Sequence, residues 1–445
     1  MTVDETIKLF SDGSLKIDFP RIVFTRRGGA SGEKLTGPGS LSQNRKGEIE
    51  IKAHIAFSEP DTMAALLNRS MVSEAGALVP EDGYHDIEAT DAVAAVWDCG
   101  RVIVNSSVSF PTSSGVFQAK PTVLRRKDCS GSSKRRLRLY FFDQETRDWK
   151  GLLGGQREME IDGLAFEMKV DEVRDRQILV EATSETDLPE AFDRRLIEAM
   201  QFVVGQSLHA AIVDEFASSA RTLRLYATSS HIRRVPAFPP LEIHTSQYTD
   251  QHVELLRCYL TYLFSLPDEG IWSPPSAFLS LLRRASEGSI DSWLIGICVA
   301  VEGLAGLIEY KPVAVTAELA KFQEHVAKWI KDEDISEGGA KRITGLVGQL
   351  GSVRPIDRMM SLVPSLLLYE DDIKTWSKAR NSAVHTRKSS SADLKSEKLQ
   401  ARIDQLHVVY RLLYFIIFQV IGYDGKYTDY AKRHFPVRDY PTKAE

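Results

Sequence analysis

Three polar residues at helical spacing give the strongest chemical signal in this sequence of 445 residues. Arg380, Asn381 and His385 lie within KTWSKARNSAVHTRK, residues 374–388. Asn381 and His385 are four positions apart and so share a helix face, and the long Arg380 side chain can reach a phosphate held over that face. An imidazole that titrates near neutral pH, a permanent cation and an amide are the groups needed for metal-free cleavage of RNA by its own 2'-hydroxyl.

A second Arg/His pair with the same spacing shows that spacing alone does not identify a catalytic site. Arg402 and His407 are also five positions apart, but Ile403 follows Arg402, and His407 begins an apolar stripe. We interpret His407 as a histidine of the core or of the helix flank. For Arg380 and His385, the alternative to a catalytic pair is an ordinary solvated helix face.

Glu302 lies in the otherwise apolar stretch VAVEGLAGLIE. A carboxylate in such a stretch is costly unless it is paired. Two interpretations remain open, that Glu302 holds Arg380 in place and that it sits at a helix edge and reaches solvent. Asp371 and Asp372 are better explained as favourable acidic residues in a first helical turn than as metal ligands.

A basic run, KPTVLRRKDCSGSSKRRLRLY, covers residues 120–140. We expect a β-hairpin with its tip at residues 130–133, which would gather these charges into a phosphate-contact patch for RNA. The alternative is a solvated or dimer-facing hairpin whose basic residues protect an edge strand. The candidate RNA-binding residues are Arg125, Arg126, Lys127, Lys134, Arg135 and Arg136.

Other catalytic and metal-binding signatures are absent from the sequence. GGASGEKLTGPGS lacks the spacing of a phosphate-binding loop, and neither zinc-protease, serine-hydrolase nor kinase motifs occur. The four cysteines are far apart, with no C-x-x-C pair and no zinc-ligand spacing. We therefore expect no metal and no cofactor, and a reduced cytoplasmic compartment.

The N-terminal half is predicted to be rich in β-strands. Short alternating runs such as LKIDF (15–19), RIVFT (21–25), EIEIKAHIAF (48–57) and RLRLYFF (136–142) are separated by turn-rich pieces such as RRGGASGEKLTGPGS. An amphipathic helix is expected around residues 196–204, and a strand at 221–228. The proline-rich segment 231–247 indicates a boundary.

The C-terminal half is predicted to be helical. The expected fold class is α+β, with a β-rich domain at residues 1–235 followed by an all-α bundle at 239–445. Ser390 and Asp393 fit a capping box before the last helix, and Gly422 is expected to end it. Candidate helices cover residues 248–266, 275–287, 289–309, 313–333, 336–351, 368–388 and 392–421.

Composition sets further limits. The formal charge is -5 with a pI of about 6.1, so no global positive field collects nucleic acid. The N-terminus carries Asp4 and Glu5 instead of the basic residues of a secretory signal. The apolar stretch 406–421 is shorter than the roughly 20 residues of a membrane span and contains Arg411, so we expect a buried core helix and no membrane.

The C-terminal region resembles the HEPN superfamily and, within it, the ApeA-like abortive-infection proteins. The resemblance rests on Arg380-Asn381-x-x-x-His385, on the helix VAVEGLAGLIE with Glu302, and on the final segment RLLYFIIFQVIGYDGKYTDY, residues 411–430. It covers about residues 245–430, and a looser likeness at FVVGQ, residues 202–206, extends it toward the N-terminal half.

The resemblance implies a metal-independent endoribonuclease, a toxic effector of bacterial anti-phage defence that leaves 2',3'-cyclic phosphate ends. A homodimer would bring two motifs into one cleft, with His385 as general base or acid, Arg380 neutralising the phosphorane, and Asn381 orienting the phosphate or the imidazole. The β-rich domain would sense a phage-derived trigger or restrain the nuclease. The competing hypothesis is a catalytically inactive HEPN-like module that binds a nucleotide or a protein, or only dimerises.

Overall fold

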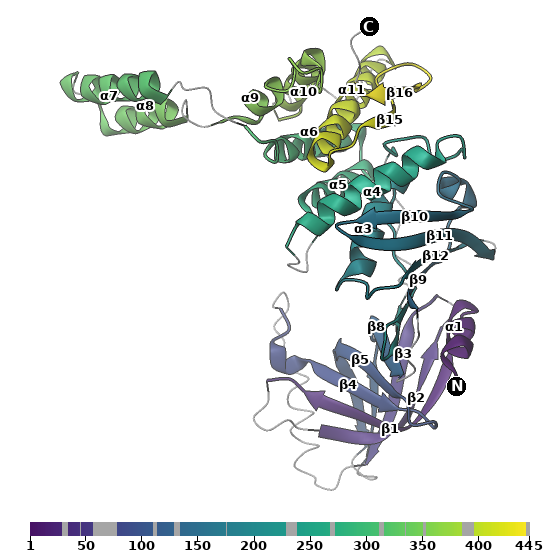
Figure 1. The fold of residues 1–445 in the computed structure, drawn as a ribbon. Coiled ribbons are helices and arrows are strands. Elements are labelled where there is room, and N and C mark those ends of the chain that lie inside the picture. Colours follow the sequence, from purple (N-terminus) through teal and green to yellow (C-terminus); the bar gives the residue numbers. More distant parts are fainter. Residues whose placement is uncertain are drawn as a thin grey trace. The chain divides into compact units, whose positions relative to one another are not determined.

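The protein divides into two compact units. In the computed structural model one unit comprises Met1–Ile197 and Leu208–Arg234, and the other Glu198–Ser207 and Val235–Glu445. The first is dominated by β-sheet and the second by helices, which is a mixed α+β architecture (Figure 1). The structure describes residues 1–28, 34–44, 46–56, 78–109, 114–128, 134–174, 176–227, 238–267, 272–310, 316–333, 335–349, 353–384 and 396–441.

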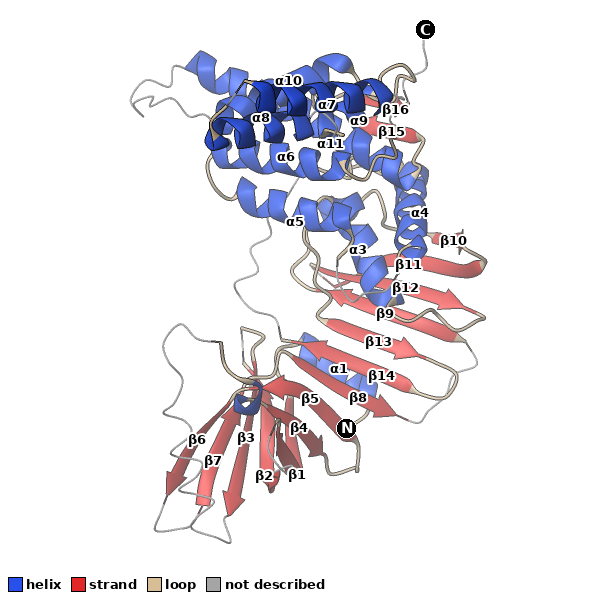
Figure 2. Ribbon diagram, turned by 90° about the vertical axis from the view of Figure 1, so that its left-hand side faces the viewer, coloured by secondary structure: helices blue, strands red, loops and turns tan. Residues whose placement is uncertain are grey.

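Within the described residues, the β-rich unit contains a 14-stranded sheet in the order β10-β11-β12-β9-β13-β14-β8-β5-β4-β1-β2-β3-β7-β6 (Figure 2). Only two residue pairs join β8 to β5, so the sheet consists of two seven-stranded groups with a narrow junction. The strands are β1 (Lys16–Arg26), β2 (Lys34–Gln43), β3 (Ile49–Ala56), β4 (His85–Thr90), β5 (Val96–Val102), β6 (Val104–Ser109), β7 (Ser114–Ala119), β8 (Val123–Asp128), β9 (Arg135–Phe141), β10 (Gln156–Ile161), β11 (Leu164–Arg174), β12 (Gln177–Ser184), β13 (Ile212–Phe216) and β14 (Arg221–Tyr226).

The helix α1 (Val3–Ser11), which the sequence analysis did not anticipate, packs on this sheet. Thr2 and Glu5 form a capping box at its start. Its buried residues Val3, Ile7 and Phe10 lie on one helix face and join the main apolar core of the unit. The expected helix near residue 196 is confirmed as α3 (Phe192–Val204).

Two stretches of the sheet differ from the sequence predictions. The two strands predicted at residues 15–19 and 21–25 form the single strand Lys16–Arg26, with a register shift between Phe19 and Ile22 around Pro20. The turn predicted in RRGGASGEKLTGPGS is wrong from residue 34 onward, because Lys34–Gln43 is strand β2. A Cβ at Gly37 or Gly39 would lie only 2.0 or 2.2 Å from a backbone oxygen of β3, so these glycines permit close strand pairing.

The hairpin predicted for the basic run is also wrong. β8 and β9 do not pair with each other, because β13 and β14 lie between them in the sheet. The apolar residues of each strand find matched partners on these two strands, with Leu124 opposite Leu225 and Leu139 opposite Val213. Residues 130–133, the expected tip, lie outside the described part of the chain.

The C-terminal unit is helical as predicted. It also contains the short helix α9 and, after its last helix, a small β-hairpin. Neither was predicted from the sequence. The elements are α4 (Thr249–Ser265), α5 (Pro274–Ser286), α6 (Ile290–Ala305), α7 (Thr316–Asp332), α8 (Glu337–Gln349), α9 (Pro355–Met360), α10 (Glu370–Val384), α11 (Ser396–Ile421), β15 (Gly425–Thr428) and β16 (Val437–Tyr440).

The helix α11 forms the centre of this unit. Its residues from Val409 to Phe418 are almost all buried, which confirms the expected core helix. Among the described residues, Glu397–Ile421 alone is long and apolar enough to cross a membrane, but 61% of its most apolar window is buried inside the protein. Gly422 follows with a φ of 67°, as expected for a helix stop. The predicted capping box at Ser390 and Asp393 lies outside the described residues.

The fully buried imidazole of His252 on α4 makes stability depend on pH. Burial lowers its pKa from 6.5 to about 4. Between these values the unfolded chain binds a proton that the folded chain excludes, so stability falls as the pH drops from 7 toward 4, by at most about 3 kcal/mol.

We expect His252→Gln to reduce this pH dependence in urea unfolding at pH 7, 6 and 5, followed by the helical circular dichroism signal. His244→Gln is the matched control, because His244 is exposed and lies just before the same helix. An unchanged slope in His252→Gln would show that another group is responsible.

Candidate active site on helix α10

The helix α10 presents a sharply divided surface. Its inner face buries Ile373, Trp376 and Ala379, which recur at intervals of three residues. The indole nitrogen of Trp376 donates a hydrogen bond to the backbone carbonyl of Cys298 on α6, over 3.1 Å. Asn381 lies on the exposed face, while Arg380 lies at the border between the two faces. α10 is thus fixed against α6 with its polar residues at the margin.

Glu302 holds Arg380 through a two-point ion pair. The Arg380 Nε and Nη2 atoms lie 2.6 and 2.8 Å from the two carboxylate oxygens of Glu302. Of the two interpretations of Glu302, the geometry supports the one in which it positions Arg380. The hydrogen bonds raise the pKa of Arg380, so the guanidinium stays a cation. Arg380 remains 43% exposed, and within the described part of the chain its Nη1 atom makes no hydrogen bond.

Of the other two motif residues, the structure describes only Asn381. Asn381 is exposed next to Arg380, at the start of the last turn of α10. His385 lies outside the described residues, one position beyond the end of α10 at Val384. The structure therefore places Arg380, Asn381 and Glu302 on two contacting helices, and the third motif residue stays a prediction from sequence.

Cys298 lies beside this ion pair but is not suited to act as a nucleophile. Burial raises the pKa of its thiol to about 12, so almost no thiolate is present at neutral pH. Cys99, Cys258 and Cys298 are free and buried, whereas Cys129 lies outside the described residues. Among the residues that the structure describes, no cluster of His, Cys, Asp or Glu could hold a metal ion.

The second pair of the same spacing does not form a site. Arg402 makes an ion pair with Asp291 at the start of α6. The ring of His407 packs edge-on against Phe238 and Phe435, with centroid distances of 5.5 and 5.1 Å. Burial lowers the pKa of His407, which confirms its interpretation as a histidine of the core or helix flank.

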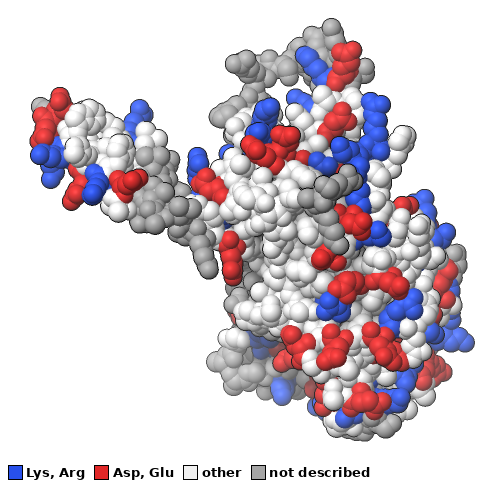
Figure 3. All heavy atoms as spheres, turned by 45° about the horizontal axis from the view of Figure 1, so that its top comes forward, with Lys and Arg blue, Asp and Glu red and all other residues white. Residues whose placement is uncertain are grey.

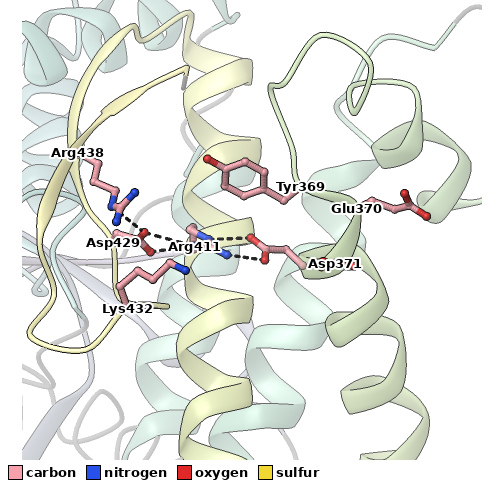
Figure 4. Close-up of a pocket in the computed structure, with 8 residues that line it drawn as sticks. Tyr369, Glu370, Asp371, Arg411, Asp429, Lys432 and Arg438 are labelled. Atoms are coloured by element: carbon pink, nitrogen blue, oxygen red, sulfur yellow. Dashed lines mark hydrogen bonds and ion pairs between the residues drawn. The ribbon is translucent and has the colours of Figure 1, made fainter. Parts of the chain in front are cut away.

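A polar pocket of about 400 Å³ opens at the other end of α10 (Figure 4). At its base Arg411 of α11 bridges two buried carboxylates, with Nη2 2.7 Å from Asp372 and Nη1 3.0 Å from Asp429. Arg438 lies 3.4 Å from Asp429. The pocket is lined by Tyr369, Glu370, Asp371, Asp372, Arg411, Asp429, Lys432 and Arg438.

The charges of this pocket are largely satisfied internally. Nε, Nη1 and Nη2 of Arg411 all donate to carboxylates, and Glu370 pairs with Lys374 on its own helix. Burial raises the pKa of Asp372, while the hydrogen bonds from Arg411 oppose that rise. Asp372 does lie in the first helical turn, as expected, but the sequence analysis missed its buried partner. We assign this network a structural role.

The six basic residues predicted to bind RNA do not share one surface. Strand alternation and the pairing registers place Arg126 and Arg136 on one face of the sheet, and Arg125, Lys127 and Arg135 on the other. Arg126 is buried, 3.0 Å from Asp128. Of the remaining five, all but Lys127 lie near an acidic partner: Arg125 near Asp98, Lys134 near Glu185, Arg135 near Asp187 and Arg136 near Glu181.

Acidic and basic side chains also intermix on the face of the molecule in Figure 3.

Comparison with protein-family models, with curated proteins and with solved structures finds no match to this chain. The residues of α10 and their partners are therefore the basis for a function of this protein.

The ion pair of Arg380 and Glu302 is expected to contribute little to folding. Both side chains are more than one-third exposed, where such pairs typically contribute about 0.5–1 kcal/mol. A double-mutant cycle with Arg380→Ala and Glu302→Gln, measured by urea unfolding, should give a coupling energy in that range. A coupling near 3 kcal/mol would instead make the pair a structural element of the core.

Arg411 is expected to behave in the opposite way. Arg411→Met leaves Asp372 buried without a counter-charge and Asp429 with Arg438 as its remaining basic partner, so we expect a loss of about 3–5 kcal/mol in the free energy of unfolding. Arg354→Ala is the control, because it removes an exposed arginine that is paired with Asp357, and it should cost less than about 1 kcal/mol. Equal effects of the two substitutions would contradict the structural role of Arg411.

Proposed function

We propose that this protein is a metal-independent endoribonuclease of the HEPN type, whose active site is built on Arg380, Asn381 and His385. The observation that carries the proposal is the two-point anchoring of Arg380 by Glu302 at the exposed margin of α10. An anchored guanidinium that keeps free donors is suited to bind a phosphate whose charge increases in the transition state. Asn381, exposed in the adjacent position, can donate to the same phosphate.

The proposed reaction needs no metal or cofactor. A base removes the proton of the 2'-hydroxyl, whose oxygen attacks the adjacent phosphorus. The bond to the 5'-oxygen breaks, and an acid returns a proton to that oxygen. The products are a 2',3'-cyclic phosphate and a 5'-hydroxyl. His385 serves as one of the two proton-transfer groups, because an imidazole exchanges protons near neutral pH.

A homodimer supplies the second proton-transfer group in this proposal, since each chain carries one such motif. The biological role that fits such an activity is a toxic effector in the cytoplasm of bacteria that limits phage spread by abortive infection. The β-rich unit would then sense a phage-derived trigger or restrain the nuclease, because an unrestrained ribonuclease harms its host.

The first test is cleavage of total RNA in EDTA by the wild-type protein and by His385→Ala, with and without lysate from infected cells. We expect fragments with cyclic phosphate ends from the wild type only. Arg380→Ala should lower the cleavage rate about 10²–10³-fold, since it removes the group that stabilises the phosphorane charge.

Arg402→Ala is the matched control, because it alters the second Arg/His pair of the same spacing and should retain the wild-type rate. If Arg402→Ala loses cleavage and Arg380→Ala does not, the chemistry belongs to Arg402 and His407, and the proposed active site is wrong. If the wild type produces no cyclic phosphate ends in buffer or in infected lysate, the proposal is refuted, and the competing hypothesis of a binding or dimerisation module gains support.

A further inference from the structure

The ion pairs at the base of the polar pocket leave positive charge unused on one of its walls, which the β15–β16 hairpin forms. Lys432 lines the pocket, is exposed, and has no hydrogen bond or ion pair with any residue that the structure describes. Arg438 is 52% exposed and approaches Asp429 through Nε. The two terminal nitrogens of Arg438 make no hydrogen bond within the described part of the chain. This wall therefore has cationic donors that a ligand can use.

The opposite wall of the pocket has unused negative charge. Asp371, in the first turn of α10, lines the pocket and its side chain is 95% exposed. Among the described residues its one ion pair is with Lys374, over 3.8 Å, and Glu370 holds that lysine more closely, at 2.9 Å. Figure 4 shows the start of α10 on one side of Arg411 and the β15–β16 hairpin on the other. The two walls thus offer opposite charges across a neutralised base.

The hairpin that carries the two cations has a strained backbone. His434 and Phe435 have φ angles of 64° and 48°, a left-handed conformation that bulky residues rarely adopt. The packing of the Phe435 ring on His407, at a centroid distance of 5.1 Å, holds this turn in place. The strained turn lies between Lys432 and Arg438 and returns the chain to the pocket, which both residues line. Strain of this kind is concentrated at functional sites.

The size of the pocket fits a small molecule. Its volume of about 400 Å³ lies within the range of roughly 300–1,000 Å³ that is typical of small-molecule sites. Tyr369 lines the pocket as well, and its ring is fixed by Phe415, at a centroid distance of 5.7 Å, and by the guanidinium of Arg411. The ring gives the carbon skeleton of a ligand an apolar surface beside the charged walls.

We propose that this pocket binds a small zwitterion of the amino-acid class, with its carboxylate at Lys432 and Arg438 and its ammonium group at Asp371. The free nitrogens of an arginine suit a carboxylate, and a lysine adds a point charge. A ligand with only negative charge is repelled by the acidic first turn of α10, and one with only positive charge by the hairpin. A zwitterion satisfies both walls, and this site does not depend on the proposed nuclease activity.

The test is isothermal titration calorimetry of the full-length protein with each of the twenty protein amino acids. We expect saturable binding of one or more of them. Lys432→Ala, Arg438→Ala and Asp371→Asn should each weaken that binding about 10-fold, which is the effect of losing one charge-assisted hydrogen bond. If no amino acid binds to the wild type, the proposal is wrong.

Two substitutions that remove the same charges nearby are the controls. Arg433→Ala changes an exposed arginine of the same hairpin that does not line the pocket, and Asp250→Asn changes an exposed acid in the first turn of α4. Both should keep the wild-type affinity. Lys432→Ala is the decisive variant, because this lysine has no partner to lose in the described part of the chain. Wild-type affinity in Lys432→Ala and Asp371→Asn would place the binding elsewhere.

Derivatives of the amino acid that binds best test each charge of the ligand separately. Its amide lacks the carboxylate, and its N-acetyl form lacks the ammonium group. We expect each derivative to bind about 10-fold more weakly than the free amino acid, because each loses the partner of one wall. If the N-acetyl form binds as well as the free amino acid, the pocket recognises an anion alone, and the zwitterion proposal is refuted. Equal binding of the amide would refute it from the other side.

Discussion

The arrangement of the helical unit depends on one buried arginine. Arg411, in the middle of the central helix α11, binds Asp372 on α10 and Asp429 in the segment between β15 and β16. A buried charge of this kind cannot be separated from its partners without leaving an uncompensated carboxylate, so it permits only one register between the helices. Because α10 is held at Asp372 and again at Trp376, the position of Arg380 one turn later is fixed by the backbone.

The two anchored arginines of this unit have different physical roles. Arg411 is 11% exposed and uses all its donor nitrogens on carboxylates, so its bonds contribute to folding and leave nothing for a ligand. Arg380 is 43% exposed and has a single carboxylate partner, so its ion pair adds little to stability but restricts its orientation. A partly exposed, oriented cation can exchange water for a phosphate at low cost, which is what a catalytic contact requires.

The parts of the fold that depend on local sequence were predictable, and those that depend on distant pairing were not. The helices α4 and α5 and the stop at Gly422 follow from apolar periodicity and capping residues. Strand β2 was predicted as a turn because it contains Gly37 and Gly39. These glycines are required by the close contact of β2 with β3, which the local sequence does not show. Glu302 was suspected as a partner of Arg380, although it lies 78 residues away, because a carboxylate in an apolar helix needs a partner. Nothing in the sequence around Asp372 and Asp429 marks them in the same way as partners of Arg411.

The basic run at residues 120–140 shows why a charge count needs a secondary structure before it predicts a binding surface. In a strand, successive residues point to opposite faces, and neighbouring strands bring acidic residues opposite each face, as Glu181 lies opposite Arg138. In a helix, by contrast, residues three and four apart share a face, so a basic run can gather its charges on one side. The run at residues 120–140 is therefore divided between two faces of the sheet and largely paired, so its positive charges do not gather into one surface for phosphate.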